Sequence, residues 1–314
     1  MSLKKLEFVL ENIDPLLFAE RGADNILVTT KRYIPGSAIR GALAHLYINA
    51  HKLQNAYEDA TFFDLFLSGK VRFLPAYPIG CRELEQGDAF VMPLSLMRSK
   101  DKTQTVDLTA AAENKAGFKK LQGFAVKKDN KLYQIDTDVK IELHMSRSGA
   151  GERITGSSRE GNVFNYEYLE PGQLFKGAYL ANDDAVELLE KVLRELNVEA
   201  LHLGRSKSAQ YGKCLYAAIP AKEAQQAALG EKLYLLAQTP YIAFGSWQRV
   251  EQAAAELLGE LAARLDCEIA KEGLQIFAAA ESIDGYVGVW QAKKQAERAL
   301  SAGTLIELRL NGVV

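Results

Sequence analysis

The sequence predicts an α+β protein built of two ferredoxin-like domains with inserted loops and hairpins. In the first two thirds of the chain, the predicted elements follow the order strand, helix, strands, helix, strand, which is that of the split βαβ unit. Beyond a polar, alanine-rich segment at 220–230, this order partly repeats, although the two parts share no sequence repeat that can be aligned. A length of 314 residues suits two domains of ordinary size. We therefore expect domains at residues 1–221 and 228–314.

The first strand and the first two helices are predicted from the spacing of their apolar residues. The stretch LEFVLENI alternates, which predicts a half-buried strand with Leu6, Phe8 and Leu10 on one face. After a loop rich in charge and glycine, Ser37 is expected to cap a helix. Within that helix the apolar residues recur at helical spacing, at Ile39, Leu43, Leu46 and Tyr47. The stretch DATFFDLFLSGK predicts a second, short helix that ends at Gly69.

The middle of the chain predicts mainly strands. Residues 71–79 and 89–97 are apolar but interrupted by proline, so we expect them at sheet edges. Residues 100–120 are polar and lack periodicity, and we expect a mobile insertion there. The stretch VKIELHM, residues 139–145, alternates again. The stretch NVFNYEYLEPGQLFKGAYL predicts two strands joined by a turn at Pro171-Gly172.

The clearest helix covers residues 183–198, DDAVELLEKVLRELNV. Acidic capping residues open it, and it carries Val186, Leu189, Leu193 and Leu196 inward. A glycine-rich stretch and a short strand, CLYAAI, complete the first domain. In the second domain we expect a strand in KLYLLAQTPYIAF, a helix in VEQAAAELLGELAARL, strands in EIAKEGLQIFAA and GYVGVW, and a last strand in TLIELRL.

Composition excludes several classes of protein. A hydrophobic content of 48% and a charged content of 25% are those of a soluble globular protein. The net charge of -2 argues against a protein that coats nucleic acid through bulk charge, but it allows a local basic groove. The three cysteines, Cys81, Cys214 and Cys267, have the spacing of neither a disulfide framework nor a zinc site. With no secretory leader and no bilayer-length apolar run, we expect a cytoplasmic protein without a membrane partner.

The stretch LHLGRSKSAQYGKC gathers positive charge on a flexible loop. No acidic residue occurs from Leu203 to Leu215, in a chain where acids outnumber bases. The cations could bind phosphate groups, the glycines allow close approach of the backbone, and the aromatic ring offers a face on which a base could stack. The alternative is a solvated surface loop. The residues concerned are Gly204, Arg205, Lys207, Tyr211, Gly212 and Lys213.

A second candidate site is the helix start in IPGSAIRGALA. The turn at Pro35 and Gly36 would leave free backbone N–H groups beside Arg40, a geometry that can hold a phosphate oxygen. Taken alone, the residues favour an ordinary capped helix in which Gly41 allows close packing. Ala42 stands where a nucleotide-binding P-loop needs its lysine, which excludes that class of NTPase.

A third basic segment is MSRSGAGERITGSSREGNVF, in which arginines are spaced by glycines and serines between two predicted strands. Arg147, Arg153 and Arg159 could lie along a nucleic-acid backbone as a flexible finger. A solvated hairpin tip explains the same composition equally well.

The histidines decide whether the sequence predicts an enzyme. Metal-independent RNA cleavage needs a general base near the attacking 2′-hydroxyl, and His45 would suit that role if its helix faces RNA. A lone histidine on a helix is more often a surface residue, His144 lies in a predicted strand, and His202 lies among apolar residues. The sequence has no metal-ligand constellation and no nucleophile elbow, so we expect neither a metal nor another cofactor.

Four stretches in order along the chain carry a resemblance to a known family. YIPGSAIRGALA, GNVFNYEYLEPGQLFKGAYL, LHLGRSKSAQYGKC and GYVGVWQAKKQAERALSAGTLIEL resemble the RAMP superfamily of CRISPR effector subunits. The resemblance covers nearly the whole chain and is closest to the Csx-ten family of type III-D systems, which is related to the subunits that cap the 5′ handle of the guide RNA. The chain departs from the pattern at Ala209 or Gln210, where the loop usually has a glycine, and at Thr304, where serine is favoured.

The resemblance implies two ferredoxin-like, or RRM-like, domains and a non-catalytic role. The chain would grip CRISPR RNA and dock on the large polymerase-like subunit and on backbone RAMP subunits. The matching RNA-binding residues are Gly36, Ser37, Arg40 and Gly41 in the first motif, and Gly204, Arg205, Lys207, Tyr211, Gly212 and Lys213 in the loop.

We expect an RNA-binding subunit of a type III CRISPR complex that is not an enzyme. Two other functions stay open. One is a metal-independent endoribonuclease of the same superfamily that processes CRISPR RNA, with His45 or His51 as the base. The other is a scaffold whose ligands are all proteins.

Overall fold

The computed structural model describes residues 3–20, 27–79, 89–110, 117–129, 131–145, 163–205, 211–219, 222–223, 232–265, 268–283, 285–287 and 292–311. They form a mixed α+β fold, as expected, in which strands outnumber helices. The chain divides into two compact units, Met1–Ala89 with Val126–Gln225 and Phe90–Ala125 with Gln226–Val314. Residues 90–125 thus belong to the second unit, although they lie within the first predicted domain. No helix in the described ranges is long and apolar enough to cross a membrane.

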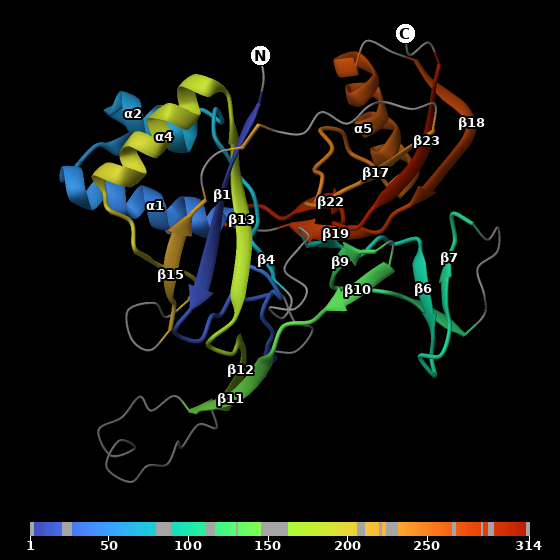
Figure 1. Ribbon diagram of the computed structural model, residues 1–314, viewed down its shortest axis with the longest axis horizontal. Coiled ribbons are helices and arrows are strands. Elements are labelled where there is room, and N and C mark those ends of the chain that lie inside the picture. The colour runs from blue at the N-terminus through green and yellow to red at the C-terminus, as the bar shows by residue number, and fades with distance from the viewer. Residues whose placement is uncertain are drawn as a thin grey trace. The chain divides into compact units, whose positions relative to one another are not determined.

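The first unit is organised around an antiparallel sheet with β1 in its interior (Figure 1). The strand order is β14-β15-β1-β13-β3, and β4 also pairs with β13 and β16 with β1. The short strands β3 and β4, which come from the proline-interrupted stretch 71–79, lie at a sheet edge, as predicted. The bounds of these strands are β1 Lys4–Asn12, β3 Arg72–Phe73, β4 Tyr77–Pro78, β13 Leu174–Ala181, β14 Ala200–His202, β15 Lys213–Ala218 and β16 Lys222–Glu223.

Two helices, α1 (Gly36–His51) and α4 (Asp183–Glu195), lie on one face of this sheet (Figure 1). The predicted inner face of β1 is confirmed, since Leu6, Phe8 and Leu10 are each at most 2% exposed. The ring of Phe8 stacks on Tyr179, with 4.6 Å between the ring centroids. Each large apolar side chain buried in this way stabilises the fold by about 1.5–3 kcal/mol. The core that holds the sheet in place therefore lies between β1 and the two helices.

The helix starts differ from the prediction in detail. The N-cap of α1 is Pro35, not Ser37, and no side chain caps this end. Proline supplies the extended backbone (φ -64°, ψ 138°) from which the helix begins at Gly36, so Ser37 already lies inside the first turn. In α4 the cap is Asn182, whose side chain accepts a hydrogen bond of 3.1 Å from the Ala185 N–H, while the predicted acidic residues follow it in the first turn.

The second predicted helix forms in two parts. After a 3₁₀ turn (η1, Ala56–Glu58), Asp59 caps α2 (Ala60–Phe62), which continues as a π-helix (η2, Phe63–Leu67). The chain leaves it at Gly69, whose φ of +79° is favoured by glycine, as predicted.

A separate three-stranded sheet in the first unit has the order β11-β12-β2. The strands are β11 (Val139–Met145), β12 (Val163–Leu169) and β2 (Leu27–Val28), with β11 antiparallel and β2 parallel to β12. The alternation that predicts β11 does not bury its apolar face, since Ile141 and Leu143 are 55% and 60% exposed. The turn at Pro171-Gly172 then leads from β12 into β13 of the other sheet.

The second unit contains a sheet of order β17-β23-β18 with one helix, α5. The predicted strands and helix are present as β17 (Lys232–Leu236), α5 (Val250–Leu265), β18 (Glu268–Phe277) and β23 (Leu305–Asn311). Ala253, Ala254 and Leu258 of α5 pack into a core with Ile306 and Leu308 of β23. Two further pairs are β19 (Ala280–Ile283) with β22 (Glu297–Leu300), and β20 (Tyr286–Val287) with β21 (Ala292–Lys293).

Residues 90–125 form strands, so the prediction of a mobile insertion at 100–120 is wrong for its described part. β7 (Thr105–Asp107) and β8 (Phe118–Lys120) both pair with β6 (Leu96–Ser99), while β5 (Phe90–Val91) pairs with β9 (Phe124–Lys128). These strands are short and polar, and their pairing depends on partners outside the local sequence, which periodicity does not reveal. The Leu94 N–H donates to the Gly303 carbonyl at 2.8 Å, which ties the segment to its own unit. β10 (Lys131–Ile135) follows β9 in the chain.

Candidate nucleic-acid interface

The start of the glycine-rich loop is fixed to the segment that follows β1. The Arg205 N–H donates to the Leu17 carbonyl at 2.9 Å, and the Gly212 N–H donates to the Pro15 carbonyl at 3.0 Å. Gly204 has a φ of +83°, and a Cβ at this position would lie 2.8 Å from the Leu17 oxygen. Both the backbone conformation and the close approach therefore require glycine. The two ends of the loop are therefore held in place by backbone hydrogen bonds to Pro15 and Leu17.

We expect Gly204→Ala to lower the free energy of unfolding by about 1–3 kcal/mol, because alanine at positive φ is strained and its Cβ has no room. Chemical denaturation of the full chain measures this change. An unfolding midpoint equal to that of the wild type would show that the loop does not need the close approach to Leu17.

Arg205 is the cation that the structure places most clearly. Its side chain is exposed, and its guanidinium lies 5.3 Å from the ring centroid of Tyr166 in β12. Among the described residues it forms no ion pair. A cation held by a ring face keeps its charge available to an anion. Lys213 is also exposed, and its backbone N–H donates to the Asp14 carboxylate at 3.1 Å. Lys207 lies outside the described residues.

Tyr211 does not offer the exposed stacking face that the sequence suggested. The side chain is only 6% exposed, and its ring packs edge-on against Tyr168, with centroids 5.8 Å apart. Its hydroxyl donates a hydrogen bond of 2.9 Å to the Glu142 carboxylate of β11. Burial, followed by this contact with Glu142, raises the pKa of the Tyr211 hydroxyl well above its ordinary value. The tyrosine thus joins the end of the loop to the β11–β12 hairpin.

The first motif divides into packed and exposed residues. Gly36 is buried where α1 meets β3, and a Cβ there would lie only 2.0 Å from the Phe73 oxygen. Ser37, Arg40 and Gly41 are exposed. A Cβ added at Gly41 would meet no atom within 4 Å, so close packing does not explain this glycine. Within the described ranges, Arg40 forms no ion pair.

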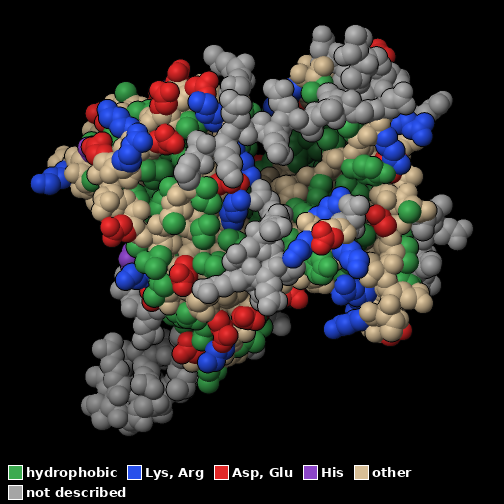
Figure 2. Space-filling model, in the orientation of Figure 1, with side chains coloured by type: hydrophobic (Ala, Val, Ile, Leu, Met, Phe, Trp, Pro, Cys, Tyr) green, Lys and Arg blue, Asp and Glu red, His purple; other side chains and the backbone are tan. Residues whose placement is uncertain are grey.

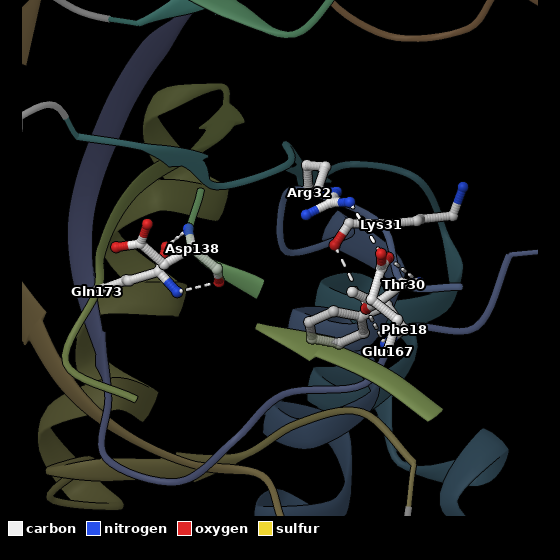
Figure 3. Close-up of polar contacts among 7 residues, drawn as sticks. All are labelled: Phe18, Thr30, Lys31, Arg32, Asp138, Glu167 and Gln173. Carbon is white, nitrogen blue, oxygen red and sulfur yellow. Dashed lines mark hydrogen bonds and ion pairs between the residues drawn. The ribbon is translucent and has the colours of Figure 1, made fainter. Parts of the chain in front are cut away.

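A buried carboxylate that the sequence analysis missed joins these parts. Glu167 of β12 is 8% exposed and accepts hydrogen bonds from the Thr30 N–H at 3.1 Å and from the Arg32 Nη2 at 3.0 Å (Figure 3). The Thr30 hydroxyl in turn accepts from the Phe18 N–H at 2.9 Å. The segment that leads into α1 is therefore held against β12. In the sequence, Glu167 is one polar residue in an alternating strand, and nothing marks it as buried.

Figure 3 also shows a second anchor of the hairpin. The Gln173 side chain accepts a hydrogen bond of 2.8 Å from the Asp138 N–H and donates one of 2.9 Å to the Asp138 carbonyl. These bonds fix the start of β11 to the turn that precedes β13. β12 itself contacts the glycine-rich loop through Tyr166 and the segment that precedes α1 through Glu167.

The third basic segment is flanked by strands as predicted. β11 and β12 pair from Val139 opposite Leu169 to Met145 opposite Val163. Arg147, Arg153 and Arg159 lie outside the described residues, so their placement as a finger stays a prediction.

The histidines differ in their surroundings. His45 is exposed on α1, with its Nε2 3.0 Å from the Asn49 side-chain nitrogen. His51 lies 3.6 Å from Glu195 of α4, and its ring packs on Tyr47. His202 is exposed in β14, so its predicted apolar surroundings are not observed, and the side chain of His144 lies outside the described residues. The described residues contain no group of three or more His, Cys, Asp and Glu that could hold a metal.

Comparisons with solved structures find subunits of CRISPR complexes. A chain of the type III-B Cmr-beta complex bound to cognate target RNA and AMPPnP is 13% identical, with a TM-score of 0.46, over 96% of this chain and 86% of that chain. A chain of a type IV-B CRISPR complex is 12% identical, with a TM-score of 0.40, over 72% and 93%. Oligomeric Cmr4 from Pyrococcus furiosus is 13% identical, with a TM-score of 0.34, over 70% and 98%.

No curated protein matches the chain. The model of the RAMP superfamily matches residues 10–214, from β1 to the start of β15. This range contains the helix start, the β11–β12 hairpin and the glycine-rich loop, and it spans more than half of the sequence. The chain belongs to the RAMP superfamily.

Proposed function

We propose that the chain is a non-catalytic RNA-binding subunit of a type III CRISPR interference complex. It grips the 5′ handle of CRISPR RNA and docks on the large polymerase-like subunit and on backbone RAMP subunits, in the cytoplasm. The type III-D, Csx-ten assignment is part of this proposal. Membership of the RAMP superfamily supports the class of complex. The placement of Arg205 supports the grip on RNA.

The observation that carries the proposal is an exposed arginine at the fixed start of the glycine-rich loop. Backbone bonds to Leu17 and Pro15 hold the loop ends, and Tyr166 holds the guanidinium. A basic residue whose backbone is already ordered loses less conformational entropy on binding a phosphate than a basic residue in a flexible loop does. Phosphate contacts of this kind position RNA without reading its bases, which suits a subunit that serves many guide sequences.

The sheet of the first unit supports a ferredoxin-like domain. In chain order, its main strands are β1, β3, β13 and β15, with α1 after the first and α4 after the third. Their spatial order, β15-β1-β13-β3, places the fourth strand beside the first and the third beside the second. This is the antiparallel arrangement of the split βαβ unit. The second unit, with order β17-β23-β18 and α5 after β17, has the arrangement of the first three strands of that unit.

The proposal predicts that the purified chain does not cleave CRISPR repeat RNA in EDTA. The polar contacts that the structure gives the two histidines are an amide, Asn49, for His45 and a carboxylate, Glu195, for His51. Neither group is a cation of the kind that stabilises the anionic transition state of cleavage. Labelled repeat RNA is incubated with the wild type and with His45→Ala and His51→Ala, and the products are separated on a gel. Cleavage that one substitution abolishes in a folded protein would establish the endoribonuclease instead.

A further inference from the structure

The sheet β7-β6-β8 of the second unit carries a row of cations and polar side chains. β6 is its central strand, and Arg98 lies opposite Thr105 of β7 and opposite Lys119 of β8. Residues that pair across neighbouring strands point to the same face. The turn between β6 and β7 adds Lys100 and Lys102, both exposed. Figure 2 shows Lys and Arg side chains beside the strands of this part of the chain.

This sheet and its turns are positive in a chain that is negative overall. Their described residues, 96–110 and 117–120, contain five cations against two carboxylates, which gives +3, whereas the whole chain has -2. The cations are Arg98, Lys100, Lys102, Lys119 and Lys120. All four lysines are exposed, and none forms an ion pair with a described residue.

The two carboxylates are occupied within their own turns. Asp101 accepts hydrogen bonds from the Ser99 hydroxyl and from the Thr103 N–H, the latter at 3.1 Å. These bonds, the one from Ser99 first, lower the pKa of Asp101. Asp107 accepts from the Thr109 N–H at 3.0 Å. Both carboxylates therefore order backbone turns and leave the lysines to solvent or to a ligand.

We propose that this lysine surface binds the phosphate backbone of a single-stranded nucleic acid, independently of base sequence. Lys100 and Lys102 lie in the turn that follows Arg98, and Lys119 lies opposite Arg98, so these three exposed lysines can contact the phosphates of one strand. Lys120 lies opposite Met97 and points to the other face of the sheet, so it is not part of this surface. Exposed Thr103, Gln104 and Thr105 supply the polar side chains that commonly contact phosphate oxygens. Protein interfaces, by contrast, are depleted in lysine.

This inference goes beyond the proposed function, which places the grip on the guide handle in the first unit. It concerns a different surface. Its ligand is any single-stranded nucleic acid, because every single strand carries the same phosphate groups. Its test therefore uses labelled oligo(dT) and oligo(U) in place of the guide RNA, and it can fail while the proposed function holds.

The experiment compares the wild-type chain with the variant K100A/K102A/K119A by fluorescence anisotropy across a salt series. Each phosphate contact with a single strand contributes about 0.7 to the slope of log K against log salt, so three lost contacts lower the slope by about 2. We expect the affinity at low salt to fall at least about tenfold for both oligonucleotides, since one lost contact already gives a severalfold loss when salt is low.

Two further variants make the result specific. K191A/R194A/R264A removes the same charge from exposed positions on α4 and α5, and it should keep the wild-type slope. Arginine at the three lysine positions should also keep it. Equal slopes for the lysine variant and its charge-matched control would overturn the proposal, as would a wild type that binds neither oligonucleotide. Loss of co-purifying subunits at unchanged slope would instead assign the surface to an acidic protein.

Discussion

Gly36→Ala is expected to destabilise the protein by about 3 kcal/mol, the upper end of the range for an overpacked site. The new Cβ would lie 2.0 Å from the Phe73 oxygen and 2.8 Å from the Phe73 carbon. These are backbone atoms of β3, so no side-chain rotation relieves the overlap, and either α1 or β3 must move. Denaturant unfolding of the full chain, followed by circular dichroism, measures the loss.

Gly41→Ala is the matched control in the same helix. Gly41 is exposed, and nothing lies within 4 Å of the position that its Cβ would take. Alanine inside a helix is favoured over glycine by about 1 kcal/mol, so this variant should be more stable than the wild type. Effects of the same sign and size at both positions would mean that the contact between α1 and β3 does not limit the choice of residue at Gly36.

Arg205→Ala combined with Lys213→Ala is expected to weaken the retention of guide RNA by about 1–3 kcal/mol, or about 5- to 150-fold. A hydrogen bond to a charged group contributes about 1.5–3 kcal/mol, and solvent and salt reduce that value at exposed positions. The loss should be the same for guides of different sequence, because phosphate contacts carry no base information. It should also shrink as salt is raised.

Guide-RNA occupancy of purified complexes, measured across a salt series alongside thermal melts, tests this second result. The control is Lys191→Ala with Arg194→Ala, which removes two exposed cations from α4. Equal occupancy for the two double variants would mean that Arg205 and Lys213 belong to a solvated loop, and the proposed grip on RNA through this loop would be lost.

Much of the fold is predictable because each main element carries its own periodicity. β1, α1, α4, α5 and β23 all form where apolar spacing places them. The strands at 105–107 and 118–120 are not predictable in this way. They are short, polar and half-exposed, and they exist because β6 pairs with both. The spacing of apolar residues reveals a strand only when one of its faces is buried, and these two strands bury few apolar side chains.

The sequence identifies the cations of the candidate site, but it does not predict which residues they and their neighbours contact. The glycine spacing and the absence of acids single out the loop around Arg205, and its part in binding RNA stays a prediction. The burial of Tyr211 depends on Glu142 and Tyr168, which are distant in sequence, so a tyrosine between glycines looks exposed when it is not. Glu167 is missed for the same reason, since its partner Arg32 lies 135 residues away.

Two adjacent residues of β12 contact the two arginines: Tyr166 contacts Arg205, and Glu167 contacts Arg32. Side chains alternate between the faces of a strand, so Tyr166 and Glu167 point in opposite directions. Deleting one residue of β12 before Tyr166 would shift the strand by one position, bringing Glu167 to Arg205 and Tyr168 to Arg32. The first cation would then be neutralised and the second would lose its anchor. Related sequences and engineered variants should therefore change the length of this strand, if at all, in steps of two.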